Sequence, residues 1–359
     1  MKKRLIIFSL SLVLLLAVAC ANVPAITATS AAVSPTLSRF RTTFLGVFDT
    51  VTTVIGYAEN EATFNAYAAK IKERLSFYHE IFNTFDSFEG VNNLRTVNEM
   101  AGIEPVKVDP EIIAFLKQCL WANEISDGNV NVAFGAVLEI WHDHRTLGTH
   151  NPEAATLPDL DLLRAANEHT NIAYVIIDEA NSTVFLKDPL MRLDVGSGSK
   201  GYATTAVANY IEAEGLTSAV LSVGGNIQAI GRRADTDTPW RIGIQNPDKT
   251  SEETTIEVLD IDGYAVVTSG VYERYYVVDG VRYHHIINPD TLFPEQTFDA
   301  VTIVSSSSGR ADALTTALFN MSLEEGMALI ENTDDVEALW LKDDTRYMSE
   351  GFAKYIAEE

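Results

Sequence analysis

The sequence predicts an α+β domain in which helices pack on a largely antiparallel, mixed sheet. Three long segments have the apolar spacing of amphipathic helices, and many short β-rich runs lie among them. Two of these runs are joined through Asp279-Gly280, a pair that accepts the positive φ angles of a tight hairpin turn. The mixture of hairpins and helices, without an internal repeat, favours this fold class.

The composition is that of a globular protein. The chain has 359 residues, of which 47% are hydrophobic and 21% charged, enough for one large core or two modest ones. Its formal net charge is −24 and no basic block follows residue 4, which disfavours a nucleic-acid partner. Cys119 lies in a segment with helical apolar spacing and is expected to be a small buried thiol.

The N-terminal segment is predicted to direct export. Residues 1–19 have a basic start, an apolar run and small residues before Cys20. The stretch "LAVAC" resembles the lipobox of bacterial lipoproteins, so we expect lipidation at Cys20 and a lipid anchor on the extracytoplasmic face of the cell membrane. Ordinary cleavage after "AVA" would instead release a soluble exported protein. Residues 20–42 are predicted to be a flexible tether and residues 43–359 the folded domain.

The expected elements follow in order along the chain. The fold should begin near Arg41 with a strand that breaks at Phe48-Asp49-Thr50, and helices are predicted over 60–85, 109–126 and 199–214. Two more helices begin near Ala311 and Leu323, before a closing strand at 337–343. The stretch 126–141 is interpreted as a helix exit, a polar loop and an apolar run. The other β-rich runs are 173–179, 183–187, 218–225, 240–245, 265–270, 272–278, 283–287 and 300–306.

Two adjacent histidines stand at the end of the second hairpin strand. Side chains alternate along a strand, so His284 and His285 must face opposite ways, one into the protein and the other toward solvent. The hairpin ends at Pro289, which places an imidazole beside a loop. A histidine there is more often a hydrogen-bonded structural group than a catalyst.

A possible anion site lies in residues 192–211. Asp194 and a Gly-Ser loop lead directly into a helix with Lys200 in its first turn. Free N–H groups at a helix start and a nearby ammonium favour a phosphate or diphosphate. A turn followed by a capped helix explains the pattern equally well. The glycine pair in 222–231 likewise either admits a ligand or forms a tight turn.

A possible cation site lies in residues 309–320. Asp312 and Thr316 are four residues apart and therefore share one face of the predicted helix. With a carbonyl from elsewhere, these two oxygens could hold a hard cation such as Mg²⁺. The alternative is that Asp312 interacts only with the helix dipole.

Taken in order, eight segments resemble the flavin transferase (ApbE) family of FAD:protein FMN transferases, from about Phe44 to Glu331. These segments are "VFDTVTTVIGY", "SDGNVNVAFG", "LDVGSGSKGYA", "VGGNIQAIG", "WRIGIQNP", "VVTSGVYERYY", "YHHIINPDT" and "ADALTTALF". The resemblance implies an ApbE-like (T-fold-like) catalytic domain. It also implies an Mg²⁺-dependent enzyme that cleaves FAD and moves its FMN half onto a Thr or Ser of a target protein through a phosphoester.

The same resemblance assigns roles to individual residues. It makes His285 the residue for proton transfer and places Mg²⁺ among the Ser197 main chain, Asp312 and Thr316. The implied FAD contacts are Phe48, Phe85, Asn129, Val130, Asn131, Asp194, Lys200 and Ile286. The acceptor expected from the family is a membrane redox subunit or an FMN-binding domain with a Thr-containing motif. Two alternatives stay open: an Mg²⁺-dependent FAD diphosphatase releasing FMN and AMP, and a non-catalytic FAD-binding lipoprotein.

Overall fold

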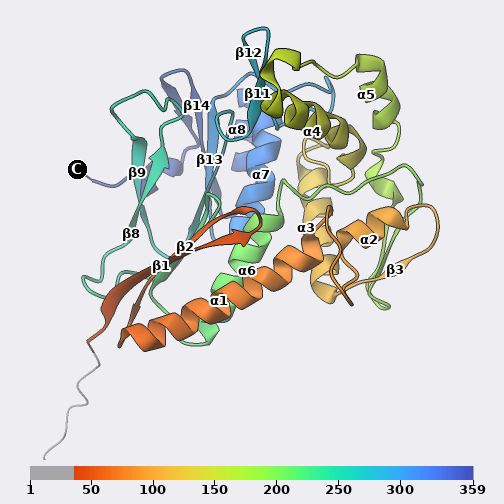
Figure 1. The fold of residues 1–359 in the computed structure, drawn as a ribbon. Coiled ribbons are helices and arrows are strands. Elements are labelled where there is room, and N and C mark those ends of the chain that lie inside the picture. Colours follow the sequence, from red (N-terminus) through yellow and green to blue (C-terminus); the bar gives the residue numbers. More distant parts are fainter. Residues whose placement is uncertain (1–35, 359) are drawn as a thin grey trace, which may run out of the picture. The chain divides into compact units, whose positions relative to one another are not determined.

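The computed structural model describes residues 36–358, so the predicted export signal, Cys20 and most of the tether lie outside it (Figure 1). The described helices are α1 (Glu61–Phe82), α2 (Leu94–Glu99), α3 (Pro110–Ile125), α4 (Gly135–His150), α5 (Leu160–Asn167), α6 (Ser199–Ala213), α7 (Ser308–Asn320) and α8 (Leu323–Glu331). The predicted helices are confirmed to within a few residues, and Cys119 is buried and free in α3.

A central sheet of eight strands organises the described domain. Its order is β1 (Ser38–Val47), β2 (Thr50–Ala58), β6 (Ala219–Val223), β7 (Asn226–Ile230), β10 (Ala265–Gly270), β13 (Ala300–Ser305), β14 (Val336–Lys342) and β15 (Thr345–Met348). Every neighbouring pair is antiparallel, which confirms the α+β prediction.

Three small sheets complete the described strands. One contains β3 (Val106–Lys107), β5 (Thr183–Leu186) and β4 (Val175–Asp178), and the other two are the hairpins β8 (Trp240–Gln245) with β9 (Thr255–Ile261) and β11 (Tyr275–Val278) with β12 (Val281–His284). The turn of the β11–β12 hairpin has φ angles of +51° at Asp279 and +81° at Gly280, which confirms the predicted tight turn.

Helices and the β8–β9 hairpin cover opposite faces of the central sheet (Figure 1). Val54 and Leu221 belong to the core shared with α1 and α6. Their neighbours along the same strands alternate to the other face, where Val220 packs in one cluster with Trp240 of β8 and Leu259 of β9. Side chains of the central strands therefore point alternately to the helix layer and to the β8–β9 layer.

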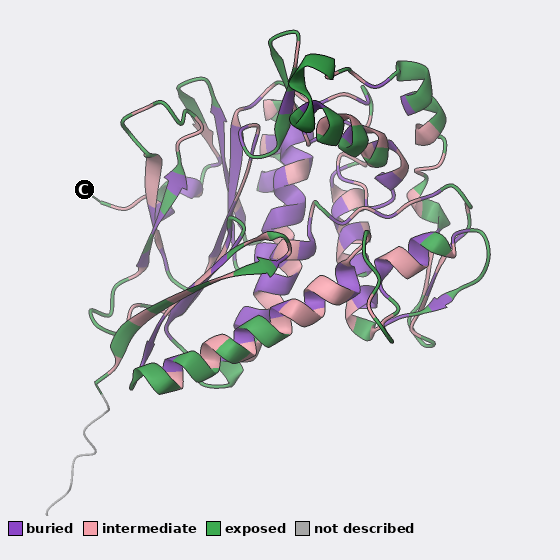
Figure 2. Ribbon diagram, viewed as in Figure 1, coloured by how far each residue is buried: buried purple, intermediate pink, exposed green. Residues whose placement is uncertain are grey.

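Helix α7 is buried along nearly its whole length, packed on β10 and β13 of the sheet and against the neighbouring α6 (Figure 2). The two helices touch at Gly201, where a Cβ atom would lie 2.3 Å from the Ser308 carbonyl oxygen and 2.5 Å from Cβ of Asp312. The Gly201 N–H donates to Oδ2 of Asp312 at 2.9 Å. Glycine is thus required by the close approach of α6 and α7.

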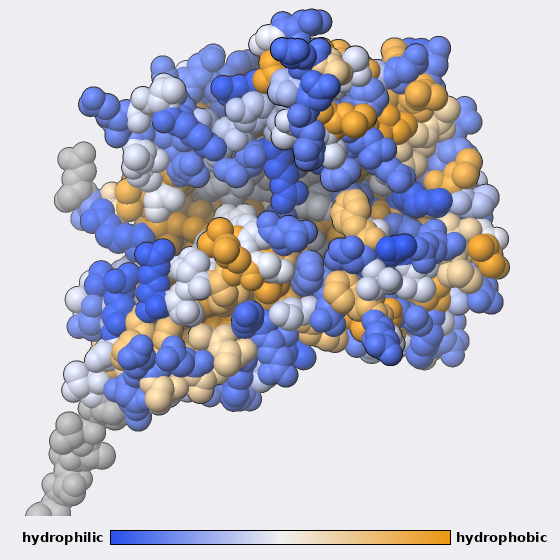
Figure 3. All heavy atoms as spheres, viewed as in Figure 1, coloured by the Kyte–Doolittle hydropathy of each residue, from blue (hydrophilic) through white to orange (hydrophobic). Residues whose placement is uncertain are grey.

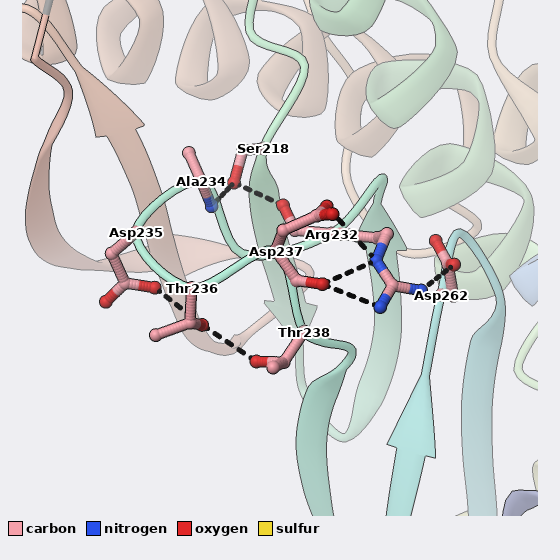
Figure 4. A network of polar contacts seen from close by, with 8 residues as sticks. All are labelled: Ser218, Arg232, Ala234, Asp235, Thr236, Asp237, Thr238 and Asp262. Atoms are coloured by element: carbon pink, nitrogen blue, oxygen red, sulfur yellow. Dashed lines mark hydrogen bonds and ion pairs between the residues drawn. The ribbon is translucent and has the colours of Figure 1, made fainter.

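A polar network fixes the loop that carries the chain from β7 to β8 (Figure 4). The Arg232 guanidinium donates to Oδ2 of Asp262 at 2.8 Å and to the Asp237 carbonyl at 2.7 Å and 3.0 Å. The Ser218 hydroxyl donates to the Arg232 carbonyl at 2.6 Å. These bonds tie the loop to β6 and to the β9–β10 turn, and so set where β8 begins.

Two sequence interpretations differ from the structure. Strand β1 begins at Ser38, inside the segment predicted as tether to residue 42, because Phe40 is half-buried and stacks on Phe64 at 5.5 Å. The second part of 126–141, interpreted as an apolar run after a loop, is the first half of α4. Its N-cap residue, Phe134, makes no side-chain capping bond, so the usual start signal of a helix is missing.

We expect Gly201→Ala to lower the free energy of unfolding by about 1–3 kcal/mol, because the added methyl overpacks the α6–α7 contact. Chemical denaturation would measure the change, with Glu212→Ala on the exposed side of α6 as control. In a helix interior, alanine is normally about 1 kcal/mol more favourable than glycine. A variant as stable as the parent protein would therefore show that the two helices do not meet at this position.

Candidate active site

A cavity of about 630 Å³ opens at one end of the central sheet. The start of β2, the end of β6, the start of β7 and the end of β10 meet there. The rest of the wall comes from α7, the end of β8, the segments 272–274 and 285–289, and the loops before α4 and α6. Figure 3 shows a recess near the middle of the visible face. Most of the residues predicted as a site line this cavity, namely Asn129, Val130, Asn131, Asp194, Ser197, Lys200, His285, Ile286, Asp312 and Thr316.

The structure does not bring Phe48 and Phe85 into the cavity lining. Phe48 lies in the β1–β2 turn, where its N–H donates to Nδ1 of His79 at 3.2 Å and its ring contacts that imidazole. Phe85 is 65% exposed, in the loop after α1, and its ring centroid is 5.5 Å from that of His142. Their predicted contacts with FAD stay predictions.

The loop 129–131 is held rigidly by its own side chains. Asn131 donates to the Thr170 carbonyl at 2.9 Å and accepts the Ala133 N–H at 2.8 Å. Asn129 donates to the Ser126 carbonyl at 2.9 Å, and Val130 is buried. Since the side-chain amide of Asn131 is used within the protein, this loop offers a ligand a fixed surface.

The segment before α6 has features of both predicted alternatives, the structural turn and the anion site. Oδ1 of Asp194 accepts the Gly196 N–H at 2.9 Å, which is a structural turn. No side chain caps α6, whose N-cap residue is Gly198, but the Gly201 N–H is already bonded to Asp312. Lys200 lines the cavity and its ammonium lies 3.4 Å from the Gly196 carbonyl. The anion site therefore depends more on Lys200 than on free N–H groups of the helix.

Asp312 and Thr316 face the cavity from α7, as the four-residue spacing predicts. Asp312 is 6% exposed, and burial raises its pKa, while Lys200, the Gly201 N–H and Arg274 oppose that rise. Between residues 36 and 358 there is no cluster of three His, Cys, Asp or Glu residues suited to a metal. One carboxylate and one hydroxyl, with Ser197 in the same wall, are oxygen ligands of the kind that a hard cation such as Mg²⁺ prefers.

The two histidines face opposite ways, as the strand predicts, but neither of them faces open solvent, so that part of the prediction was wrong. His284 is 2% exposed; its Nε2 bonds the Glu295 carbonyl and its Nδ1 accepts the Ile286 N–H at 3.2 Å. It is therefore a neutral, fully bonded structural group. His285 lines the cavity, and its buried Nδ1 has no hydrogen-bond partner among the described residues. Burial, then the charges of Arg274 and Arg145, lower the pKa of His285 to about 3.

Sequence reasoning missed Arg274 and Asn320, which also line the cavity. Asn320 lies one helical turn beyond Thr316, and its amide nitrogen donates to the Asn129 carbonyl at 3.0 Å and to the Ile287 carbonyl at 3.3 Å. It thereby joins two of the predicted FAD-binding loops. The repeat of polar residues at 312, 316 and 320 was a signal that could have identified Asn320.

Three cations lie in or near the cavity: Lys200 and Arg274 in its lining, and Arg145, whose charge acts on His285. In the part of the chain that the structure describes, Arg145, Lys200 and Arg274 form no ion pair with a carboxylate. All three lower the pKa of His285, so their positive charges act on the same place. Cations without acidic partners are suited to a ligand that carries several negative charges.

We expect Arg274→Gln to raise the pKa of His285, because a positive charge beside the imidazole disfavours its protonation. An NMR titration of histidine-labelled protein would follow the change. Arg282→Gln, an exposed arginine on the same hairpin that contacts Tyr275, serves as the control and should leave the pKa unchanged. Equal pKa values in all three proteins would place Arg274 too far from His285 to influence it.

Known proteins resemble this chain over most of its length. The model of the ApbE family matches residues 48–340. Curated proteins named FAD:protein FMN transferase are 31% identical in Klebsiella pneumoniae, over 77% of this chain and 82% of that protein, and 36% identical in Treponema pallidum, over 70% and 71%.

Solved structures show the same similarity. The crystal structure of the ApbE protein of Thermotoga maritima superposes with a TM-score of 0.76 at 27% identity, covering 90% of this chain and all of that one. The flavin transferase ApbE of Vibrio cholerae superposes with a TM-score of 0.74 at 26% identity, covering 89% of this chain and all of that one. The extent of the family match and the identity to the curated relatives show that this chain belongs to the ApbE family.

Proposed function

We propose that the protein transfers the FMN half of FAD onto a Thr or Ser hydroxyl of a target protein in an Mg²⁺-dependent reaction. The observation that carries this proposal is that one cavity brings together unpaired cations, a neutral histidine and a buried carboxylate on α7. The names of the curated relatives support the same activity.

The chemistry requires one phosphorus–oxygen bond to form and another to break. The acceptor hydroxyl oxygen bonds to the phosphorus of the FMN half, the bond from that phosphorus to the bridging oxygen breaks, and AMP leaves with the electron pair. Negative charge grows on the phosphate oxygens during this step, and Lys200 and Arg274 are the lining cations that can stabilise it. Mg²⁺ held by Asp312, Thr316 and the Ser197 main chain would neutralise further charge on those oxygens.

His285 is the group we propose to take the proton of the acceptor hydroxyl. Because its pKa in the free protein is about 3, it is neutral at pH 7, and its unprotonated ring nitrogen can accept a proton. The cations that lower this pKa are those that would bind the diphosphate. A bound dianion offsets their charge, so the pKa of His285 should rise when FAD binds and make the imidazole a better base.

The test is an assay for covalently bound flavin. Purified protein lacking residues 1–20 is mixed with FAD, Mg²⁺ and an FMN-binding domain of a membrane redox subunit, and the products are separated on a denaturing gel. Fluorescence that stays with the acceptor supports transfer. Release of free FMN and AMP without labelling would identify an FAD diphosphatase, and binding without turnover would identify a non-catalytic FAD-binding protein.

We expect His285→Ala to slow transfer by a factor on the order of a hundred or more, the usual scale for a lost general base, while FAD still binds. His284→Ala should instead lower the melting temperature, since it removes a buried, fully bonded side chain. His150→Ala, an exposed residue at the end of α4, is the control. Similar losses of rate in both His284→Ala and His285→Ala would argue against a distinct role for His285.

We expect Mg²⁺ to stabilise the protein through Asp312. A metal at a hundred times its Kd adds about 2.7 kcal/mol to the free energy of unfolding, so the melting temperature should rise with Mg²⁺. Asp312→Ala should abolish this rise and transfer, whereas Thr316→Ala should be milder and partly restored at high Mg²⁺. Thermal unfolding measures both variants without turnover. A normal Mg²⁺ response in Asp312→Ala would remove Asp312 from the metal site.

Membrane attachment through Cys20 completes the proposal. Within residues 36–358, no helix has the length and apolar character needed to span a bilayer. We expect Cys20→Ala to move the exported protein from the membrane fraction to the soluble fraction, because a lost acyl chain removes the anchor. Fractionation of cells followed by immunoblotting would show the shift. A processed variant that stays in the membrane fraction would exclude lipidation of Cys20 as the anchor.

A further inference from the structure

Asn226 lines the cavity from the first position of β7 and is almost completely buried. The residue is 2% exposed, and its Oδ1 is buried without a hydrogen-bond partner among the described residues. Few buried polar atoms of a folded protein lack a partner, because leaving one unpaired destabilises the fold. In the wall of a cavity, such an atom points to a ligand that supplies the missing partner.

The glycine pair before Asn226 forms a tight turn. Gly224 and Gly225 have φ angles of +55° and +90°, and they join Val223 of β6 to Asn226, its partner in the ladder. The Gly224 N–H also donates to the Val51 carbonyl of β2 at 3.1 Å. The turn and the ladder therefore hold the side chain of Asn226 at a fixed place on the end of the sheet.

The side chain of Asn226 points toward α6 and α7. Gln228, two residues along β7, faces these helices, because its Oε1 accepts hydrogen bonds from the Thr205 hydroxyl at 3.4 Å and the Ser308 N–H at 3.2 Å. Side chains two residues apart on a strand share a face. Val267, which pairs with Asn226 from β10, belongs to the core cluster of α7. Asn226 therefore lies on the helix side of the central sheet.

Asn226 also lies at the level of the contact between α6 and α7. Gln228 bonds both helices about one turn further from the cavity than the hydrogen bond between Gly201 and Asp312. Asn226 is two strand residues, about 6.6 Å, closer to the cavity than Gln228, and one helical turn covers about 5.4 Å. These displacements agree, so the amide lies beside the Gly201–Asp312 hydrogen bond and the neighbouring Lys200.

We propose that the side-chain amide of Asn226 contacts the diphosphate of FAD and the Mg²⁺ bound to it, an inference that rests on the proposed transfer of FMN. Nδ2 donates a hydrogen bond to a phosphate oxygen. Oδ1 cannot pair with a phosphate oxygen, because the diphosphate of FAD carries no hydrogen at neutral pH. It instead accepts a hydrogen bond from a water molecule on Mg²⁺, an ion that usually keeps several waters in protein sites.

The position of Asn226 favours the diphosphate over the two ring systems of FAD. An asparagine amide can also pair with the edge of a nucleobase or a flavin, since these rings present donors beside acceptors. The amide, however, lies level with Asp312 and Lys200, the residues proposed to hold the metal and the phosphates. Binding measurements with parts of FAD distinguish the three contacts.

The probes are ADP with Mg²⁺, which carries the diphosphate, and adenosine and riboflavin, which lack it. We expect Asn226→Ala to raise the Kd for ADP about ten- to hundredfold, the scale of a lost hydrogen bond to a charged group. The Kd values for adenosine and riboflavin should change by less than about twofold, as measured by titration calorimetry. An equal loss for adenosine or riboflavin would assign the amide to that ring, and an unchanged Kd for ADP would overturn the contact.

Chemical denaturation of the ligand-free variants separates a binding role from a structural one. Asn226→Ala should not lower the free energy of unfolding, because it removes a buried atom that has no partner. Gln228→Ala, the matched control on the same face of β7, loses hydrogen bonds to both helices. It should lower the stability and leave the Kd for ADP within about twofold. Unfolding or an equal loss of stability in Asn226→Ala would make Asn226 a structural residue.

Asn226→Asp keeps the shape of the side chain and tests the contact with the metal. A carboxylate attracts Mg²⁺ and repels phosphate. The rise of the melting temperature with Mg²⁺ alone should therefore be larger than in the parent protein, whereas ADP at saturating Mg²⁺ should bind more weakly. A weaker response to Mg²⁺ would show that residue 226 does not lie near the metal.

The covalent-flavin assay separates this contact from the proposed function. A parent protein that binds ADP through Asn226 but labels no acceptor would overturn the transfer of FMN and keep the contact. Labelling by the parent protein, together with an unchanged Kd for ADP in Asn226→Ala, would overturn the contact and keep the transfer.

Discussion

The hydrogen bond from the Gly201 N–H to the Asp312 carboxylate connects the two helices that carry the site. It exists only because residue 201 has no side chain, which lets α6 and α7 approach until their backbones meet. Lys200 precedes this contact on α6 and Thr316 follows it on α7, so one close approach sets the separation of an ammonium, a carboxylate and a hydroxyl. The sheet beneath α7 then fixes all three relative to the end of β10.

Positive charge is concentrated around His285, although the chain as a whole is acidic. The protein carries a net charge of −24, yet Arg145, Lys200 and Arg274 act together on His285 without carboxylate partners within 4 Å among the described residues. Like charges held close together destabilise the free protein locally, and a polyanionic ligand relieves that repulsion. The same arrangement explains why Asp312 can stay buried, since Lys200 and Arg274 both oppose the rise of its pKa.

Local patterns predicted much of this structure, and long-range packing accounts for what they missed. Helix α6 has a glycine just after its end and α1 a capping Asn60, so both could be placed from the sequence, whereas α4 begins at Gly135 without a capping side chain. Asp312 and Thr316 could be paired because helical spacing is local. The contribution of Arg274 depends on how the β11–β12 hairpin lies against α4, and no spacing along the chain encodes that contact.

The cavity that turns around the end of the sheet has a consequence for the order of events. Its lining includes Lys200 and Asp312 on the helix side of the sheet and Ser222 and Ile227 on the other side, so a second substrate has room on one wall while FAD occupies the other. If the proposed transfer takes place in this cavity, it passes through a ternary complex, without a flavin bound covalently to the enzyme between two half-reactions. Steady-state rates measured against both substrates should accordingly give intersecting lines in a double-reciprocal plot and not parallel ones.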